Sequence, residues 1–406
     1  MRLFSKNTVL SSLWRALSCL FDWRGFVRNL IGKKNIDVCF ITNMRDEIDR
    51  DNFLGNWRPK SGHFNGPRYY YRGVIGRTRA LDVTAEEMFA ESGRAKAREL
   101  FVSACEWAEK KGAKVILLAA GTKRLFEGRV EELKGRFPGM IFTIGDNGTT
   151  LILEEETLEV LRKANLPRKA KIAVLGPYGF LGEEMLKKLL SQKYNVVGIG
   201  ANKKHLLQTK EKYGIPVFSS FQKATQVDAV VACTHSEKVR ITANNFDQLR
   251  KSDKKLLVID VAEPSNLKKS EFRKIADKII RIDSGNAYSS KLKYVLGPIT
   301  YRLFRLSRGV TFGCFAETLA IGRALQQGKA MNGIDWFSVT DLNKRIVKNL
   351  FEESDGKGFR VPSHRSYGKL VKNFDLNLVS KAERESKFTG QIVCQKIGKA
   401  LASLIL

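Results

Sequence analysis

The sequence predicts an α/β fold with two lobes, one of them built on a parallel β-sheet, and helical extensions at both termini. Short apolar runs typical of buried strands alternate with amphipathic helical patterns from about residue 71 onward. One such run passes through a glycine-rich turn directly into a helix, which is the order of a βαβ unit. The chain of 406 residues also exceeds what one ordinary hydrophobic core holds, so more than one domain is expected.

The composition is that of a globular protein with a strong excess of basic residues. Hydrophobic residues make up 43% and charged residues 28% of the chain, and the formal net charge is +29. Six cysteines lie far apart without a C-x-x-C pair, and only four histidines occur. These counts favour neither a disulfide scaffold nor a protein-bound metal, and we expect a reducing, cytoplasmic compartment.

Residues 1–70 are expected to form a basic amphipathic extension. Apolar residues recur at helical spacing in "LSSLWRALSCLFDWRGFVRNLIGKK", with arginines and lysines between them. No run of about 20 uncharged apolar residues occurs, so this stretch does not predict a membrane-spanning helix. Two interpretations are open: peripheral contact with an anionic membrane, with Trp14 and Trp23 as anchors, or packing on the protein itself.

Residues 71–166 are expected to form an α/β lobe that binds the substrate. A long helical pattern follows Thr84, a candidate N-cap with Glu87 three residues later. A strand, "AKVILLAA", comes next, and a second strand-like piece, "MIFTIGDNGTTLIL", brackets a turn over residues 145–148. Another helical pattern then leads to Pro167, where the second lobe is expected to begin.

Residues 167–308 carry the glycine turn, in "KIAVLGPYGFLGEEMLKKLL". In such a turn the first glycine permits the tight bend, the second lets the backbone approach a phosphate, and the third lets the helix pack on the strand. Further strands follow in "DAVVACT", "KLLVIDVA" and "KIIRIDSG". We therefore predict a Rossmann-like dinucleotide-binding domain. Its candidate cofactor contacts in the turn and after the strand "DAVVACT" are Gly176, Tyr178, Gly179, Phe180, Leu181, Gly182 and Thr234.

The end of the second strand of this domain indicates which nicotinamide cofactor is preferred. NAD-dependent enzymes usually place an acidic residue there for the ribose hydroxyl, whereas this chain has Asn202, Lys203 and Lys204. Lysines pair with the 2′-phosphate that a carboxylate would repel. The sequence thus favours NADPH, although two solvated lysines at a helix start are the simpler interpretation.

Residues 309–360 are expected to form a helical segment that packs back on the substrate lobe, followed by a basic extension over residues 361–406. Cys314 lies where the first of these helices begins, in "GVTFGCFAETLAIGRAL". Unpaired N–H groups in a first helical turn favour a thiolate, and Arg302, Arg305 and Arg308 lie nearby in the sequence. Cys314 is accordingly a candidate nucleophile, and the alternative is a small apolar core residue.

Several segments, taken in order, resemble the cyanobacterial-type long-chain fatty acyl-ACP reductases, which form fatty aldehydes. The resemblance covers roughly residues 72–360. The segments that carry it are "GRTRALDVTAEEMFAESGRAKAR", "FEGRVEELKGRFPGMIFTIGDNGTT", "KIAVLGPYGFLGEEMLKKLL", "LLVIDVAEPSNL" and "TFGCFAETLAIGRAL". The chain departs from the usual sequence motifs of that family at Thr143–Asp146 and at Ile259–Ala262.

The resemblance implies that Cys314 takes the acyl group from a carrier thioester and that NADPH reduces the resulting enzyme thioester to a long-chain aldehyde. Glu317, one helical turn further on, is a candidate for proton transfer or for orienting a donor. His235 is a second candidate acid, because the carboxyl ends of parallel strands face the cofactor in such domains. Plain structural roles remain open for both residues.

The resemblance and the charge together imply the partner. Residues 1–70 carry 12 basic and six acidic side chains and residues 361–406 carry eight and three, so most of the excess lies in the central body. We expect it to attract an acidic acyl carrier protein rather than a nucleic acid. Two other functions remain open: a reductase like glutamyl-tRNA reductase, whose nucleophile would precede the dinucleotide domain, and a non-catalytic nucleotide-binding module.

Overall fold

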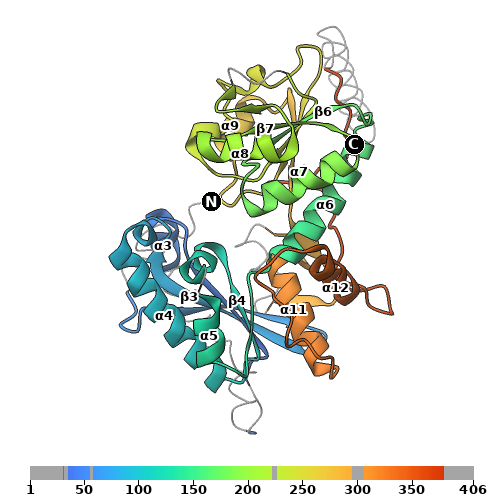
Figure 1. The fold of residues 1–406 in the computed structure, drawn as a ribbon. Helices are drawn as coiled ribbons and strands as arrows, with labels where there is room; N and C mark the ends of the chain where they lie inside the picture. The colour runs from blue at the N-terminus through green and yellow to red at the C-terminus, as the bar shows by residue number, and fades with distance from the viewer. Residues whose placement is uncertain are drawn as a thin grey trace, which may run out of the picture.

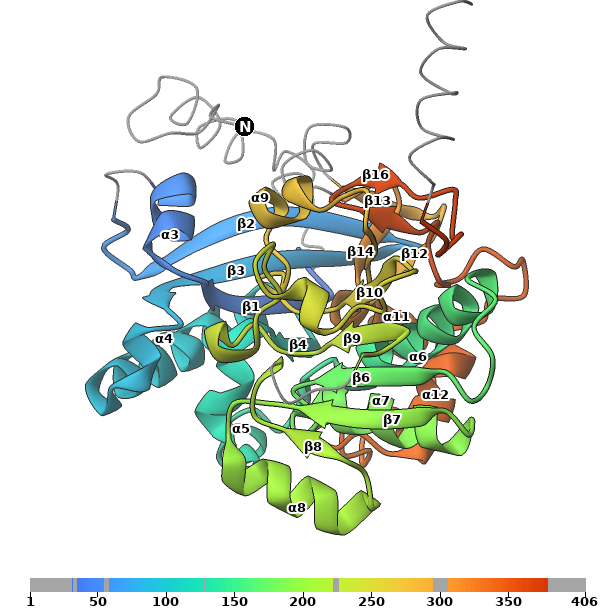
Figure 2. The same cartoon turned by 90° about the horizontal axis from the view of Figure 1, so that it is seen from above.

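The computed structural model describes residues 31, 35–54, 58–127, 129–221, 226–294 and 306–378. These residues form two lobes, each built on a six-stranded sheet. In Figure 1 the first lobe, which contains β1 to β5, lies below, and the Rossmann lobe, which contains β6 to β11, lies above. Figure 2 shows both sheets from above.

The sheet of the first lobe has the order β13-β2-β3-β1-β4-β5. Its inner pairs β3–β1, β1–β4 and β4–β5 are parallel, whereas β2 and β13 add an antiparallel edge. All four residues of β4 are buried, as expected for a parallel strand covered on both faces. The strands are β1 Val38–Met44, β2 His63–Tyr71, β3 Val74–Thr84, β4 Val115–Leu118, β5 Ile141–Thr143 and β13 Leu292–Tyr294.

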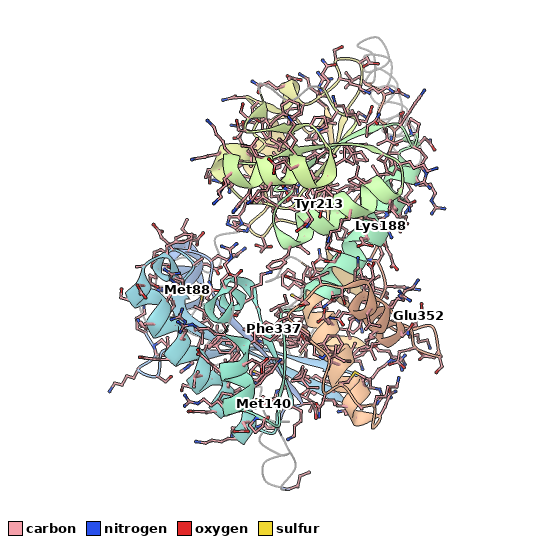
Figure 3. All side chains as sticks on the ribbon, viewed as in Figure 1. Met88, Met140, Lys188, Tyr213, Phe337 and Glu352 are labelled. Atoms are coloured by element: carbon pink, nitrogen blue, oxygen red, sulfur yellow. The ribbon has the colours of Figure 1, made fainter. Side chains whose placement is uncertain are left out.

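Helices cover both faces of this sheet. On one face α4 buries Ala97, Phe101 and Ala104, and on the other α11 buries Phe315 and Leu319. Figure 3 shows Met88 and Met140 among the side chains of this lobe. The helices of the lobe are α3 Glu47–Leu54, η1 Glu87–Phe89, α4 Glu91–Lys110, η2 Ala120–Phe126, α5 Val130–Arg136, α6 Asp146–Lys163, α11 Gly313–Gln326 and α12 Asp341–Phe351.

The Rossmann lobe has a fully parallel sheet in the order β11-β10-β9-β6-β7-β8. Counted from β6, this is the doubly wound order 3-2-1-4-5-6, which confirms the predicted fold class. Its strands are β6 Lys171–Leu175, β7 Asn195–Ile199, β8 Val217–Phe218, β9 Ala229–Ala232, β10 Leu256–Asp260 and β11 Ile279–Asp283. Its helices are α7 Phe180–Ser191, α8 Lys203–Tyr213, η4 Glu237–Val239, η5 Phe246–Gln248 and α9 Lys269–Lys274.

Two small antiparallel pairs complete the described fold, and one long helix joins the lobes. Strand β12 (Asn286–Tyr288) pairs with β14 (Val310–Phe312), and β15 (Arg365–Ser366) pairs with β16 (Lys369–Leu370). Helix α6 contacts α11 and α12 as well as α7 of the Rossmann lobe. It rises between the two lobes in Figure 1.

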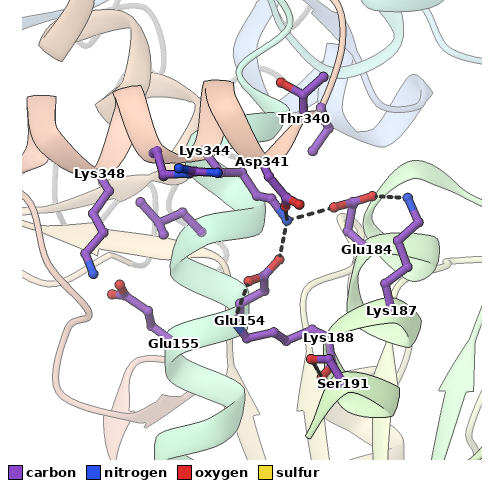
Figure 4. A pocket seen from close by; sticks show the side chains of 13 residues that line it. Glu154, Glu155, Glu184, Lys187, Lys188, Ser191, Thr340, Asp341, Lys344 and Lys348 are labelled. Atoms are coloured by element: carbon purple, nitrogen blue, oxygen red, sulfur yellow. Dashed lines mark hydrogen bonds and ion pairs between the residues drawn. The ribbon is translucent and has the colours of Figure 1, made fainter.

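A charged hollow of about 680 Å³ marks the junction of α6, α7 and α12. The ammonium of Lys344 on α12 lies 3.0 Å from Glu154 on α6 and 2.9 Å from Glu184 on α7. Figure 4 shows these side chains converging, with Lys187 beside Glu184 and Lys188 beside Glu154. Burial alone would lower the pKa of Lys344, but its hydrogen bonds to the two carboxylates raise that pKa overall. One cation thus ties three helices together.

Several boundaries differ from the expectations. The strand expected after the turn at residues 145–148 is the beginning of helix α6, because the chain enters the helix directly at Asp146. Strand β1 pairs with β3 and β4 in the middle of the first sheet and β2 pairs with β3, so the expected start of that lobe at residue 71 is wrong. The long helix expected after Thr84 is divided into η1 and α4, although Thr84 and Glu87 do form a capping box. Strand β13 crosses from the Rossmann segment back to the first sheet.

The C-terminal part of the described chain is not a free extension. Phe374 and Leu376 pack in the core of the Rossmann lobe, and Lys254 forms a bridge with Asn377. The expected helix around Trp14 and Trp23 and the basic residues after 378 lie outside the described residues. Among the residues described, no helix has the length and apolar character to cross a membrane.

Candidate active site between the two lobes

The glycine turn after β6 has the shape of a phosphate cradle. Gly176 has φ +77°, and a Cβ there would lie 2.8 Å from Cβ of Thr234, at the end of the neighbouring strand β9. A Cβ on Gly182 would lie 2.0 Å from the carbonyl oxygen of Gly176, so the helix packs directly on the turn. Gly179 is exposed and has only this oxygen nearby, at 3.6 Å. The turn is therefore open to solvent, and to a ligand, at Gly179.

The start of helix α7 adds donors to this cradle. Its N-cap is Gly179, and no side chain caps the first turn. First-turn N–H groups without a capping side chain, together with the helix dipole, favour a bound phosphate. Phe180 is 56% exposed at this helix start and Leu181 is half-buried. The residues present therefore fit the pyrophosphate of a dinucleotide.

Of the residues after β7, one caps a helix and two are free to contact a cofactor phosphate. Asn202 accepts a hydrogen bond from the backbone N–H of His205 and caps α8, and its own N–H donates to the Tyr178 hydroxyl. The predicted contact by the Asn202 side chain thus competes with capping. Lys203 and Lys204 are exposed in the first turn of α8, where a 2′-phosphate would need them.

Thr234 and His235 follow β9 at the switch point of the sheet, where ligands of doubly wound domains bind. Thr234 accepts a hydrogen bond from the Ser236 N–H. His235 is exposed, and its pKa is lowered by partial burial and then by Arg124 of the first lobe and by Arg240. The charge of Arg124, in η2 of the first lobe, thus acts on the imidazole of His235 in the Rossmann lobe.

Cys314 lies in the first turn of α11, as predicted, and it touches the first turn of α6. A Cβ on Gly145, which has φ +70°, would lie 2.2 Å from Cβ of Cys314. Gly145 is the N-cap of α6, and the N-cap residues of α6 and α11 make no side-chain capping bond, although the Glu317 carboxylate binds the Gly148 N–H in the first turn of α6. Two helix N-termini therefore converge at this cysteine.

The predicted depression of the Cys314 pKa is wrong for the protein without substrate. Burial and then the Asp146 carboxylate raise the pKa of the Cys314 thiol to about 12, and Lys123 acts in the opposite direction. The Lys123 ammonium lies 3.0 Å from Asp146 Oδ1. Arg308 is exposed, and Arg302 and Arg305 lie outside the described residues. The resting thiol is consequently protonated.

Glu317 supports the loop that touches Cys314. Its side chain is fully buried, with the Thr143 hydroxyl donating to Oε1 at 2.5 Å and the Gly148 N–H donating to Oε2 at 2.6 Å. Burial raises the pKa of Glu317 to about 7, against the effect of these hydrogen bonds. Glu317 therefore holds both ends of the turn at residues 143–148.

Other cysteines that the structure describes are poor nucleophiles. Cys39 and Cys105 are fully buried, and burial raises both of their pKa values, that of Cys39 to about 12. Burial also raises the pKa of Cys233. The two cysteines that precede the dinucleotide domain thus lack the exposure that a nucleophile needs. No group of three metal-ligating side chains occurs within the described ranges.

Sequence reasoning missed the charged residues that face this site from the first lobe. Lys123 and Arg124 lie in η2, which follows β4, and Asp146 follows β5. The two strands are parallel neighbours, so their carboxyl ends meet at one edge of the sheet. Charged residues directly after two adjacent strands were a signal that could have identified them.

Comparisons with known proteins agree with the Rossmann lobe. Residues 159–283 match the family model of shikimate / quinate 5-dehydrogenase, which places a dehydrogenase-like, NAD(P)-binding Rossmann domain there and covers less than half of the chain. No curated protein matches the chain. The match and the strand order confirm the nucleotide-binding fold and leave the substrate open.

Solved structures are similar to parts of this chain at low identity. Shikimate 5-dehydrogenase from Thermus thermophilus, in complex with NADP(H) and shikimate, is 12% identical over 78% of this chain and 100% of its own, with a TM-score of 0.34. L-tryptophan dehydrogenase from Nostoc punctiforme is 13% identical over 78% and 88%, with a TM-score of 0.34. The nucleotide-binding domain of glutamyl-tRNA reductase from Thermoplasma volcanium is 20% identical over 32% and 84%, with a TM-score of 0.24.

Proposed function

We propose that this chain is an NADPH-dependent reductase that converts a long-chain acyl thioester to a fatty aldehyde through an acyl group on Cys314. The observation that carries the proposal is the position of Cys314, in contact with Gly145, at two converging helix N-termini. The first turn of α11 is the proposed source of N–H donors for the oxyanion of an attacked thioester, since Glu317 already binds the Gly148 N–H of α6. The ordered resemblance to acyl-ACP reductases supports the same chemistry.

The residues beside Cys314 are proposed to accept the thiol proton and to stabilise the charge that develops during the reaction. The resting thiol is neutral, so attack on the acyl carbonyl requires that its proton leave as the sulfur–carbon bond forms. Asp146 is the carboxylate that raises the pKa of the Cys314 thiol most, and it is the proposed acceptor of that proton. Lys123, paired with Asp146, offsets the negative charge that develops when the carrier thiolate departs.

The Rossmann lobe is the proposed cofactor site. Gly176, Gly179 and the first turn of α7 would hold the pyrophosphate, and Lys203 and Lys204 the 2′-phosphate. Bound NADPH supplies a hydride for reduction of the thioester carbonyl. Thr234, close against Gly176, would limit the depth to which the cofactor enters.

An acidic acyl carrier protein is the proposed donor of the acyl group. The net charge of +29 supports electrostatic attraction of such a partner, and CoA is the alternative carrier. The amphipathic sequence before residue 35 supports peripheral contact with an anionic membrane, into which a long-chain aldehyde would partition.

The direct test is incubation of the full chain with palmitoyl-ACP, with and without NADPH. We expect an acyl adduct on the protein by intact mass spectrometry without NADPH, and a fatty aldehyde by gas chromatography with it. Absence of both products with ACP and CoA thioesters would contradict the proposal. Palmitoyl-CoA in the same assay distinguishes a wrong carrier from a wrong reaction.

A second function is favoured by the Lys123–Asp146 ion pair itself. The Lys123 side chain is partly exposed and its ammonium lies 3.0 Å from Asp146 Oδ1, so the pair has a proton to donate in the reduction of a simple carbonyl. Residues 159–283 match a dehydrogenase family model. Such an enzyme would not need the thiol. NADPH-dependent turnover of shikimate or quinate that survives Cys314→Ser and is lost in Lys123→Met would establish this alternative.

A further inference from the structure

Asn266, on the loop after β10, binds the neighbouring loop after β9 inside the Rossmann lobe. Its side chain is fully buried. Its Nδ2 donates to the carbonyl oxygens of Thr234 at 2.7 Å and Val239 at 3.2 Å, and its Oδ1 accepts from the Ile241 N–H at 3.0 Å. A flipped amide would place Oδ1 against two carbonyl oxygens, so these partners fix the orientation of the amide. One side chain therefore binds residues 234–241 at three points.

The first of these points lies beside the glycine turn. Thr234 packs so close to Gly176 that a Cβ on this glycine would lie 2.8 Å from Cβ of Thr234. Thr234 follows β9, which pairs with β6 where the strand order of the sheet reverses. Groups packed this closely transmit a displacement to their neighbours. The bond from Asn266 thus holds a residue that limits the space in the cofactor turn.

The peptide that joins Thr234 to His235 has a bonded carbonyl oxygen and an N–H without a protein partner. The oxygen accepts from Asn266, and in this trans peptide the N–H points the opposite way. The N–H belongs to His235, which is exposed, and it makes no hydrogen bond to any residue that the structure describes. Such a backbone donor is available to an acceptor oxygen of a ligand. Its direction depends on the bond that Asn266 makes.

A buried ion pair holds the loop that carries Asn266. The Asp260 carboxylate accepts from the backbone N–H groups of Asn266 at 3.1 Å and Leu267 at 3.3 Å. Arg281 donates to the same carboxylate at 2.9 Å, and both charged side chains are at most 1% exposed. The Tyr367 ring lies 4.0 Å from the Arg281 guanidinium, and its hydroxyl donates to the Leu267 carbonyl oxygen. The position of Asn266 is therefore set by groups from three separate segments.

We infer that Asn266 is a positioning residue for the nicotinamide cofactor: it turns the peptide between Thr234 and His235 so that the His235 N–H binds an oxygen of the cofactor. Both amide hydrogens and Oδ1 of Asn266 are engaged within the lobe, so the residue acts through this peptide. Without Asn266 the peptide can turn over, and the unpaired Thr234 carbonyl then repels the acceptor oxygens of the cofactor. The inference rests on the cofactor site of the proposed function and is independent of the chemistry at Cys314.

The test measures nucleotide affinity and stability of the full chain in Asn266→Ala and in a matched control, Asn245→Ala. Asn245 binds the same segment at its other end: it donates to the Arg240 carbonyl oxygen at 2.9 Å and accepts from the Thr242 N–H at 2.8 Å. Dissociation constants for NADPH and NADH are measured by nucleotide fluorescence, and thermal midpoints by differential scanning fluorimetry.

Asn266→Ala should weaken the binding of NADPH and NADH about tenfold each, because the peptide contact does not involve the 2′-phosphate. Asn245→Ala should lower the thermal midpoint and leave both affinities within about twofold of the wild type. Unchanged affinity in Asn266→Ala, a loss as large in Asn245→Ala, or a loss confined to NADPH would overturn the positioning role alone. Wild-type protein that binds neither nucleotide would overturn the cofactor site itself, and this inference with it.

Tyr367→Phe makes the same comparison where Asn266→Ala does not fold. Tyr367 is partly buried, and the substitution keeps its ring on Arg281 but removes its hydrogen bond to Leu267, which loosens the loop that carries Asn266. Both nucleotide affinities should fall about threefold. Tyr213→Phe, which removes a hydroxyl bond to Glu183 elsewhere in the lobe, is its control and should leave them unchanged. Equal affinities in Tyr367→Phe and the wild type would also overturn the positioning role.

Discussion

Gly145 and Cys314 are in contact so close that residue 145 has no room for a side chain. A Cβ at Gly145 would lie 2.2 Å from Cβ and 2.6 Å from Cα of Cys314. Gly145 also has φ +70°, in the left-handed region that L-residues avoid. The turn that caps α6 and the residue proposed as nucleophile therefore determine one another's position.

The first prediction is that Gly145→Ala destabilises the protein and displaces Cys314. Strain at positive φ costs about 1–2 kcal/mol and overpacking about 1–3 kcal/mol more, so we expect a clearly lower thermal midpoint. Gly214→Ala is the matched control, because Gly214 has φ +65° and nothing within 4 Å of its added Cβ. Differential scanning fluorimetry of both variants measures the thermal midpoints. Equal decreases in the two variants would show that the contact with Cys314 does not exclude a side chain at residue 145.

Replacement of the nucleophile should separate acylation from cofactor binding. In Cys314→Ser we expect no acyl adduct and no aldehyde, because a serine hydroxyl ionises far less readily than a thiol. NADPH affinity, measured by quenching of nucleotide fluorescence, should remain within about twofold of the wild type. Cys105→Ser is the control and should still form the adduct. Peptide mapping of an adduct to Cys105 or Cys233 would refute the assignment.

Cofactor preference should depend on the first turn of α8. The double substitution Lys203→Glu with Lys204→Glu should weaken NADPH binding by about tenfold to hundredfold and NADH binding much less, since only NADPH carries the 2′-phosphate. Lys210→Glu with Lys212→Glu changes the charge equally at the other end of the same helix. Isothermal titration with both nucleotides compares the two variants, and parallel losses for NADPH and NADH would mean that Lys203 and Lys204 do not contact the 2′-phosphate.

The parts of the fold that sequence reasoning recovered have local signals. The turn at Gly176, Gly179 and Gly182 lies between an apolar strand and an amphipathic helix, and all three positions belong to one short segment. The position of Cys314 at a helix start was likewise readable, because Phe312 ends a strand and an apolar helical pattern follows.

The parts that it missed depend on contacts between distant segments. Strand β1 begins with a short apolar run, Val38–Ile41, but its place in the sheet comes from pairing with β3 and β4, which follow it in the chain. Glu317 has the spacing of an exposed helical residue, yet its partners Thr143 and Gly148 lie some 170 positions earlier in the chain. The direction of the Cys314 pKa shift also depends on distant segments. The sequence indicates the helix start, but it does not indicate the burial of the thiol or the nearby charge of Asp146.

The buried Glu317 should make stability depend on pH. Its pKa in the folded protein is about 7, above the ordinary value of 4.5, so the folded state binds more protons than the unfolded state between these values. The free energy of unfolding should therefore fall by up to about 3 kcal/mol as the pH rises from 4.5 to 7, and Glu317 should change it little above pH 7.

The variant Glu317→Gln tests this effect, because a glutamine resembles the protonated acid. It should have a flatter pH profile and a higher thermal midpoint than the wild type at pH 8. Thermal midpoints over this pH range, with Glu131→Gln at an exposed site as the control, measure the difference. Identical profiles for Glu317→Gln and the wild type would contradict the raised pKa.

The last prediction separates the two charges that act on the Cys314 thiol. Asp146 raises its pKa and Lys123 lowers it, and the two side chains are 3.0 Å apart. Asp146→Asn should lower the thiol pKa and accelerate alkylation by iodoacetamide at pH 8, because only the thiolate reacts and its fraction grows as the pKa falls. Lys123→Met should do the reverse, since it removes the cation and leaves the carboxylate unpaired beside the sulfur. A change of one pKa unit alters the thiolate fraction about tenfold, well above the error of a rate measured by mass spectrometry of the Cys314 peptide.

The control is Lys134→Met, which breaks an exposed pair with Glu131 and should leave the alkylation rate unchanged. If both substitutions shifted the rate in the same direction, the change would come from altered access to the thiol rather than from charge, and the electrostatic role proposed for Lys123 and Asp146 would have to be abandoned.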